Sequence, residues 1–468
     1  MTSSAWTFAF AVQTLLAQPT SAELEEVRQI RRIQDAALAG SDAFALVESL
    51  TTEVGPRLAG TEAEARARGW AVRTCTTLGF DRVRVEEATV EGWVRGVERA
   101  EIVAPFPQRL AVTALGLSIA TPQDGIEAEV VRFGSLAEMQ DALPGTAKGK
   151  IVFIDRAMPK TQDGSGYGAV IGIRSKGPTA AARLGAAAVL IRSVGTDHHR
   201  FPHTGMLRYQ PEQAPPIPAG ALAVPDADQL TRILGYKAEV RLRLVLRPRF
   251  VGPKPTGNVI AELVGTERPD EIVLLGAHLD SWDLGTGAVD DGAGVGIVLA
   301  SAALLKRLEL QPKRTIRVVL FGAEEVGLVG AKAYAKAHQD ELDQHIAAAE
   351  SDFGAGRIYQ FSASVSEGAW PKVEDIQRHL VGLNVILGNN RSGGGPDLIP
   401  LKSARVPILA PKQDGRDYFD VHHTADDVLD RVDADNLDQN VAVYATMAHI
   451  VANSDVDFRA DATAAAER

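Results

Sequence analysis

Cysteine is almost absent from the sequence: Cys75 is the single one among 468 residues. One cysteine cannot build an internal disulfide framework, and it cannot supply a thiolate-rich zinc or iron–sulfur site. Any metal that the chain binds must therefore be held by histidine and carboxylate side chains.

Positive charge is also scarce, since 49 Lys and Arg residues stand against 60 Asp and Glu residues, a formal net charge of −11. General nucleic-acid binders and proteins of anionic membrane surfaces depend on clustered positive charge. The composition therefore argues against a nucleic-acid or membrane partner. No run of about 18 apolar residues occurs either, so no transmembrane helix is predicted.

The N-terminus carries a short apolar segment, AWTFAFAVQTLLA at residues 5–17, followed by Gln18 and Pro19. Such a segment with a small residue at its end is typical of a secretory leader. We therefore predict a leader over 1–20 and a secreted or periplasmic protein. A cytoplasmic protein is the alternative, because no Lys or Arg precedes the apolar segment.

The rest of the chain divides into three regions of different texture. From 246 to 457, apolar strands such as EIVLLGAHLD alternate with helical segments, as in a mostly parallel mixed sheet with helices on both faces. Residues 22–110 are predicted to belong to this same α/β domain, which makes it discontinuous. Residues 111–245, with short strands and Gly/Pro-rich loops, are predicted to form a smaller β-rich insertion, and 458–468 a polar tail.

Residues that can bind metal follow several of the predicted strands. In open α/β sheets, ligands bind at the carboxyl ends of the strands. Taken singly, each of these metal-competent residues has an ordinary structural explanation, such as a helix cap or a solvated loop. Their joint occurrence is what points to a metal, because buried carboxylates need a counter-charge. The residues are His278, Asp280, Asp290, Asp291, Glu324, Glu325, Asp352, His422 and His423.

Two imidazoles cannot complete two zinc sites, so a dinuclear centre needs a shared carboxylate, and we assign Asp290 as this bridge. His278, Asp290 and Asp352 are predicted to hold one Zn²⁺. Asp290, Glu325 and His423 are predicted to hold the other. Two catalytic residues complete the prediction: Glu324 acts as general base, and Asp280 orients the imidazole of His278.

Other candidate residues are given no role in the reaction. Asp197, His198, His199 and His203 form a loop that either shapes the substrate entrance or is solvated. Tyr418 is a candidate oxyanion group but is better explained as a packed aromatic. Asp397 is an open case, and no substrate-binding residue is assigned.

The segments HLDSWDLGTGAVDDGAG, GAEEVG, ESD and HHTADD resemble the motifs of the di-zinc aminopeptidase superfamily, and within it the carboxypeptidase Q-like group. GPRLAGTEAE near the N-terminus is similar to the same group. KGKIVFIDR and AARLGAAAVLIRS in the insertion resemble a protease-associated domain. The resemblance implies the ligands named above, with His423 favoured over His422 because Asp427 follows it at the fourth position. In the family a Thr usually follows this Asp, whereas here Val428 follows Asp427.

This resemblance implies a di-zinc metallo-exopeptidase with small peptide substrates that have free termini, and a homodimer. Whether such an enzyme is better called an aminopeptidase, a carboxypeptidase or a dipeptidase stays open, because for a dipeptide the cleaved bond is the same. Two alternatives remain: a metal-free receptor or scaffold of the same fold, and a single-zinc acyltransferase of the glutaminyl cyclase kind.

Overall fold

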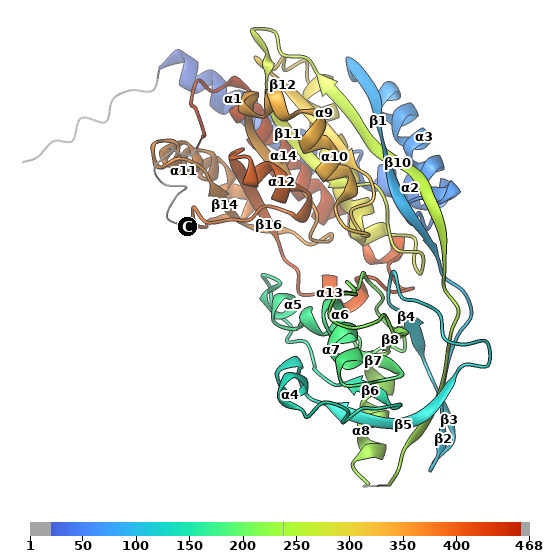
Figure 1. Cartoon of the computed structure of the whole chain (residues 1–468). Coiled ribbons are helices and arrows are strands. Elements are labelled where there is room, and N and C mark those ends of the chain that lie inside the picture. Colours follow the sequence, from blue (N-terminus) through green and yellow to red (C-terminus); the bar gives the residue numbers. More distant parts are fainter. Residues whose placement is uncertain (1–19, 237, 460–468) are drawn as a thin grey trace, which may run out of the picture.

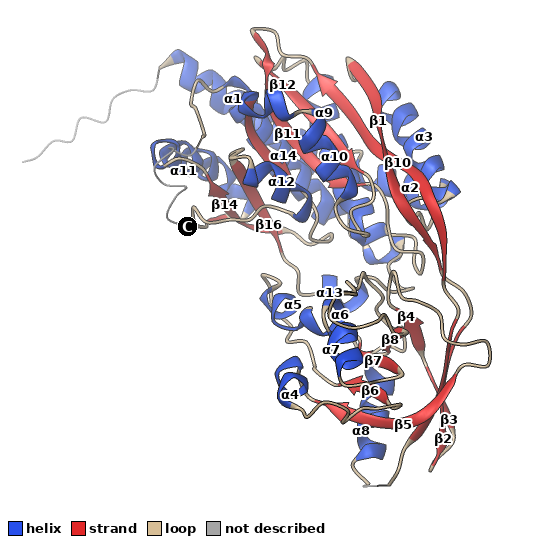
Figure 2. Ribbon diagram, in the orientation of Figure 1, coloured by secondary structure: helices blue, strands red, loops and turns tan. Residues whose placement is uncertain are grey.

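The computed structural model describes residues 20–236 and 238–459, which form two eight-stranded sheets with helices around them (Figures 1 and 2). The mixed α/β class predicted from the sequence is confirmed. The predicted leader up to residue 19, and residues 460–468 of the predicted tail, lie outside the described residues.

The first sheet is parallel in its centre, and antiparallel pairs flank this centre on both sides. β11 pairs in parallel with both β12 and β13, and β13 pairs in parallel with β16. Buried apolar residues fill these central strands, which is why their sequences do not alternate. In spatial order the strands are β1 (Arg82–Val94), β10 (Arg249–Leu263), β12 (Arg314–Phe321), β11 (Arg268–His278), β13 (His345–Glu350), β16 (Ile408–Gln413), β14 (Ile358–Ser364) and β15 (Ile386–Leu387).

Helices cover this sheet, and α9 (Ala293–Arg307), which packs against α14 (Ala434–Asn453), is almost entirely buried. The segment Ala288–Arg307 is long and apolar enough to cross a membrane, but its apolar window is fully buried inside the protein, as in the core helix of a globular domain. The other helices of this part are α1 (Ser21–Leu38), α2 (Ala43–Glu53), α3 (Glu62–Thr77), α10 (Val329–Ala337), α11 (Trp370–Leu380), α12 (Ile399–Ser403) and α14 (Ala434–Asn453).

The second sheet lies below the first in Figure 1 and carries shorter strands. In spatial order these are β3 (Gln108–Leu110), β2 (Glu98–Ala104), β9 (Arg241–Leu246), β5 (Ile126–Phe133), β6 (Ile151–Ile154), β7 (Ala188–Arg192), β8 (Ala219–Leu222) and β4 (Val112–Ala114). Its helices are α4 (Leu136–Asp141), α5 (Ser165–Val170), α6 (Gly172–Ser175), α7 (Gly177–Arg183) and α8 (Val224–Leu234).

β2 and β3 belong to the second sheet, so the prediction that all of 22–110 belongs with the first is wrong for these two strands. Alternating side chains predict a strand but do not tell which sheet it joins, because that depends on distant partners. β1 and β10, paired along their whole length, connect the two sheets. The other domain boundaries stay predictions.

Candidate metal centre

The residues predicted to bind metal converge at the carboxyl ends of the central strands. His278 is the last residue of β11, and Glu324 and Glu325 follow β12. Asp352 follows β13, and Asp290 lies in the short turn η1 (Ala288–Gly292) that precedes α9. The parallel pairing of β11 with β12 and β13 brings these strand ends to one edge of the sheet.

Asp290 lies between two histidines. Its Oδ1 is 3.1 Å from Nε2 of His278, and its Oδ2 is 3.3 Å from Nε2 of His423. Asp352 lies on the other side, beside His278, with its Oδ1 3.7 Å from Nε2 of His278. Glu325 lies on the His423 side, with its Oε2 3.1 Å from Nε2 of His423. The five residues thus form two groups that share one carboxylate.

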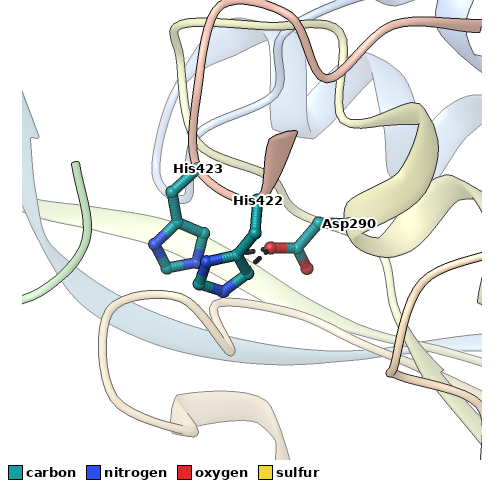
Figure 3. Close-up of side chains that lie close together, drawn as sticks. All are labelled: Asp290, His422 and His423. Carbon is teal, nitrogen blue, oxygen red and sulfur yellow. Dashed lines mark ion pairs between the residues drawn. The ribbon is translucent and has the colours of Figure 1, made fainter. Parts of the chain in front are cut away.

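His422 and His423 both reach Asp290 from the loop after α13 (Tyr418–Val421), as Figure 3 shows. Their rings stack with centroids 3.5 Å apart. Nε2 of His422 is 3.6 Å from Asp290, whereas His423 is nearer and also contacts Glu325. His423 is therefore the better candidate ligand, and its φ of 62° is one that side chains adopt at a cost.

The donor set fits a divalent cation. Oδ2 of Asp290 and Oε1 of Glu325 are buried and have no hydrogen-bond partner among the described residues. Buried carboxylate oxygens without a partner are costly, and a bound cation would neutralise them. Burial raises the pKa of Glu325, while His278 and His423 outweigh burial and hold the pKa of Asp290 well below its ordinary value. Imidazole nitrogens and carboxylate oxygens are ligands typical of zinc.

Asp280 has a different contact from the predicted one. Nδ1 of His278 lies 3.0 Å from the backbone carbonyl oxygen of Asp280, and the carboxylate is farther away, at 3.8 Å. The carboxylate instead accepts hydrogen bonds from the backbone N–H groups of Glu324 and Glu325, at 3.0 and 3.3 Å. Asp280 therefore orients the imidazole through its carbonyl and fixes the Glu324–Glu325 turn through its side chain.

Two further carboxylates hold the backbone of the centre. Asp427 accepts from the backbone N–H groups of Val289 and Asp290, at 2.6 and 3.2 Å. Asp291 accepts from those of His278 and Gly294, both at 3.1 Å. The Asp290–Asp291 peptide bond is cis. The sequence marked Asp427 only by its spacing from His423, and nothing in the sequence predicted which backbone it would hold.

Asp197 and His203, which received no role from the sequence, are buried beneath the His422–His423 loop. Nδ1 of His203 is 2.6 Å from the backbone oxygen of His422, and its Nε2 is 2.9 Å from Asp197. The backbone N–H of Thr204 donates to the oxygen of His423 at 3.0 Å. The loop of the second sheet thus clamps the histidine loop, whereas the neighbouring His198 and His199 are exposed.

This clamp gives a first prediction. Replacing His203 with leucine keeps the bulk but removes both hydrogen bonds, so the His422–His423 loop loses its fixed position. Zinc affinity is expected to fall roughly tenfold or more, as for other residues that orient metal ligands. Competition with a chromophoric chelator would measure it, with His198→Leu in the same loop as the control. An unchanged affinity would show that the clamp does not position the histidines.

A cavity of about 890 Å³ opens onto the centre. It is lined by His278, Asp290, Glu324, Glu325 and Asp352 and by residues of the second sheet's helices. Glu324 is partly buried on this wall, and burial together with its acidic neighbours raises its pKa. The structure therefore places Glu324 beside the candidate metal ligands and on the wall of the cavity.

Other residues singled out in the sequence are also located. Tyr418 lines the cavity and packs against Phe353 and His422. Asp397 is fully buried and does not line the cavity. Both of its carboxylate oxygens lack a hydrogen-bond partner within residues 20–236 and 238–459, while its backbone N–H donates to Glu350. Cys75 is buried in α3, and burial raises its pKa to about 12, as expected of a packed thiol.

Comparison with known proteins shows the family of the chain. The model of peptidase family M28 matches residues 258–448. Carboxypeptidase Q of Homo sapiens is 34% identical over 406 residues, which are 86% of this chain and 84% of that protein, and the protein of the same name in Mus musculus is 33% identical over 408 residues, 87% and 84% of the two chains.

Solved structures agree as well. The crystal structure of a peptidase M28 precursor from Shewanella amazonensis SB2B is 49% identical, with a TM-score of 0.92 over 93% of this chain and 98% of that one. An aminopeptidase from Aneurinibacillus sp. strain AM-1, at 20% identity and a TM-score of 0.62 over 92% and 99% of the two chains, shares the fold. Because relatives above 30% identity match along most of the chain, the protein belongs to peptidase family M28.

Proposed function

We propose that the protein is a di-zinc exopeptidase that hydrolyses dipeptides or short peptides with free termini. The observation that carries the proposal is the position of Asp290, whose two oxygens each lie near a different histidine. In this proposal His278, Asp290 and Asp352 hold one zinc ion, and Asp290, Glu325 and His423 hold the other. Zinc bound there would act as a Lewis acid on the peptide carbonyl and lower the pKa of an attacking water.

The remaining steps fall to residues of the chain. The carboxylate of Glu324 takes the proton from the attacking water and passes it to the nitrogen of the leaving amine. Asp280 keeps Glu324 in place through the backbone N–H that its carboxylate accepts. The partly enclosed cavity of about 890 Å³ favours short peptides over a folded protein.

The names of relatives support this class of reaction. The mouse and human relatives are carboxypeptidases by name, and a more distant relative in Bacillus subtilis is an aminopeptidase by name. Both names describe removal of a terminal residue, and a dipeptide substrate satisfies both. The scaffold alternative expects a missing ligand, and a single-zinc cyclase needs no shared carboxylate, so the gathered set with Asp290 between two histidines favours the exopeptidase.

Metal content tests the proposal directly. We expect about two zinc ions per chain by elemental analysis, one for each of two ligand groups. Removal of the metal with a chelator should abolish the hydrolysis of dipeptides, and added zinc should restore it. Absence of zinc in protein purified without chelator would favour the scaffold. About one ion per chain, with cyclisation of N-terminal glutamine and no peptide cleavage, would favour the acyltransferase.

Three further parts of the proposal rest on the sequence. Residues 111–245 are proposed to be a protease-associated domain, the mature protein to be secreted or periplasmic, and the active form to be a homodimer. Mass determination of the secreted protein and of its oligomer in solution would test the last two.

A further inference from the structure

A fully buried arginine, Arg57, contacts two of the segments that carry candidate metal ligands. It lies in the loop between α2 and α3. Its Nε donates to the backbone oxygen of Leu279, the first residue after β11, at 2.5 Å. Its Nη1 and Nη2 donate to the backbone oxygens of Thr286 and Gly287, just before η1, at 2.6 and 2.9 Å. One guanidinium therefore joins the end of β11 to the loop that leads into η1.

The backbone around Arg57 is fixed to the same segments. Its N–H donates to Oγ of Ser281 at 3.2 Å, and its carbonyl oxygen accepts from the N–H of Ser281 at 3.4 Å. Gly287 has a φ of 61°, and a Cβ at this position would lie 2.4 Å from Cβ of Ser281 and 2.8 Å from Nη1 of Arg57. Glycine is therefore the residue that leaves room for the guanidinium here. The loop before η1 is built around the arginine side chain.

The positive charge of Arg57 does not by itself favour a metal ion. Burial lowers the pKa of this guanidinium, and the carboxylate charges of Asp427, Asp280 and Asp291 oppose that effect. Within the described residues, however, the guanidinium donates to backbone carbonyls and not to these carboxylates. A cation this close to the candidate ligands would repel a zinc ion. Any contribution of Arg57 to zinc binding must therefore come from the backbone geometry that it imposes.

We propose that Arg57 is a positioning residue of the metal centre, which holds His278 against Asp290 before a metal ion binds. This inference rests on the proposed di-zinc function and deepens it. His278 directly precedes the carbonyl that Nε holds, and Asp290 follows soon after the carbonyl that Nη2 holds. Nε2 of His278 and Oδ1 of Asp290 lie 3.1 Å apart. A site whose ligands are already in place binds its ion more tightly, because the loop does not have to be ordered on binding.

Arg57→Lys tests this role without changing the charge. A lysine cannot span the carbonyls on both segments, because it lacks the planar fork of a guanidinium. Zinc affinity, measured by competition with a chromophoric chelator, is expected to fall roughly tenfold or more. An unchanged affinity would overturn the proposal.

Arg314→Lys is the matched control. This buried arginine also donates to a backbone carbonyl, that of Val451, but it lies at the opposite end of β12 from Glu324. Both substitutions should lower the stability of the metal-free protein, because both remove a buried guanidinium. Zinc affinity should fall in Arg57→Lys and stay at the wild-type value in Arg314→Lys. An equal fall in both variants would assign the effect to general destabilisation, and the proposal would be wrong.

Hydrogen exchange of the metal-free protein measures the positioning directly. The N–H groups of Val289 and Asp290 donate to Asp427, so their exchange reports whether the segment 279–292 is held in place. This segment should exchange faster in Arg57→Lys than in the wild type, and at the wild-type rate in the control. Equal protection in Arg57→Lys and the wild type would show that other contacts hold the segment, which contradicts the proposal.

Gly287→Ala is a second variant, in which the arginine itself is unchanged. The added methyl group displaces the guanidinium, so zinc affinity should again fall. Gly252→Ala, at a φ of 76° and with no atom within 4 Å of the added carbon, controls for backbone strain and should bind zinc as the wild type does. The double variant Arg57→Lys/Gly287→Ala should lose no more affinity than the larger single loss. Additive losses would mean that the glycine does not act through Arg57 and would count against the proposal.

Zinc affinity and hydrogen exchange separate this inference from the proposed function, because neither depends on hydrolysis. If the wild type binds zinc but cleaves no dipeptide, the exopeptidase proposal fails, and a lower zinc affinity in Arg57→Lys still supports the positioning role. If the wild type cleaves dipeptides and Arg57→Lys binds zinc as tightly as the wild type, the exopeptidase proposal stands and the positioning role is wrong.

Discussion

Glu324→Gln is expected to reduce the hydrolysis of dipeptides roughly a thousandfold while the protein keeps its zinc. General acid–base groups contribute on the order of 10²–10⁴-fold to enzymatic rates, and the substituted amide cannot accept the proton of the attacking water. No ion pair joins the carboxylate of Glu324 to a histidine of the described residues. The carboxylate of Glu325, by contrast, lies 3.1 Å from Nε2 of His423. Steady-state kinetics and elemental analysis of the same preparation would measure both effects.

Two results would change the assignment. Unchanged turnover with full zinc would remove Glu324 as the general base. Loss of zinc together with activity would make Glu324 a ligand instead of a base. Glu212→Gln, on an exposed loop of the second part, controls for the loss of one negative charge and should leave both readouts unchanged.

The strand-end residues could be predicted from the sequence because their positions follow from local patterns. Apolar runs such as EIVLLGA identify buried parallel strands, and residues just after such strands meet at one edge of the sheet. His278, Glu325 and Asp352 are therefore found together without knowledge of any distant contact. The α/β class followed from the same alternation of strands and helices.

Contacts between distant segments could not be predicted in this way. His203 and His422 lie 219 residues apart in the chain, and their hydrogen bond exists only because the second part of the chain folds against the histidine loop. The carboxylate of Asp280 binds backbone N–H groups 44 and 45 residues away instead of its neighbouring imidazole. The membership of β2 in the second sheet has the same cause, since a strand pattern carries no information about its partner.

The contact between Arg174 and His423, with Nη1 of Arg174 3.3 Å from Nδ1 of His423, could not be predicted either, and for a different reason. In the sequence it is one basic residue in the segment GIRSKGP, without a histidine or carboxylate nearby to suggest a site. Its proximity to His423 depends on the packing of α6 against the loop of Thr204 and the histidine loop.

Asp290→Asn is expected to remove zinc from both sites, whereas Asp352→Asn should remove it from one. Asp290 contacts the histidines of both groups, while Asp352 contacts only His278 among the histidines of the described chain. Replacing a shared carboxylate by a neutral amide lowers the affinity for both ions, since each ion loses a charged ligand. Elemental analysis should therefore give about two ions per chain in the wild type, about one in Asp352→Asn and close to none in Asp290→Asn, if one ion occupies each ligand group.

Thermal unfolding provides a second measurement of the same difference. A ligand that binds only the folded state at a thousandfold excess over its dissociation constant adds about 4 kcal/mol to the free energy of unfolding. Added zinc should raise the midpoint temperature of unfolding most in the wild type, less in Asp352→Asn and hardly at all in Asp290→Asn. The control Asp343→Asn, at an exposed position, should behave as the wild type. If Asp290→Asn instead retains one ion and loses one, its carboxylate serves a single zinc, and the two histidine groups bind metal independently.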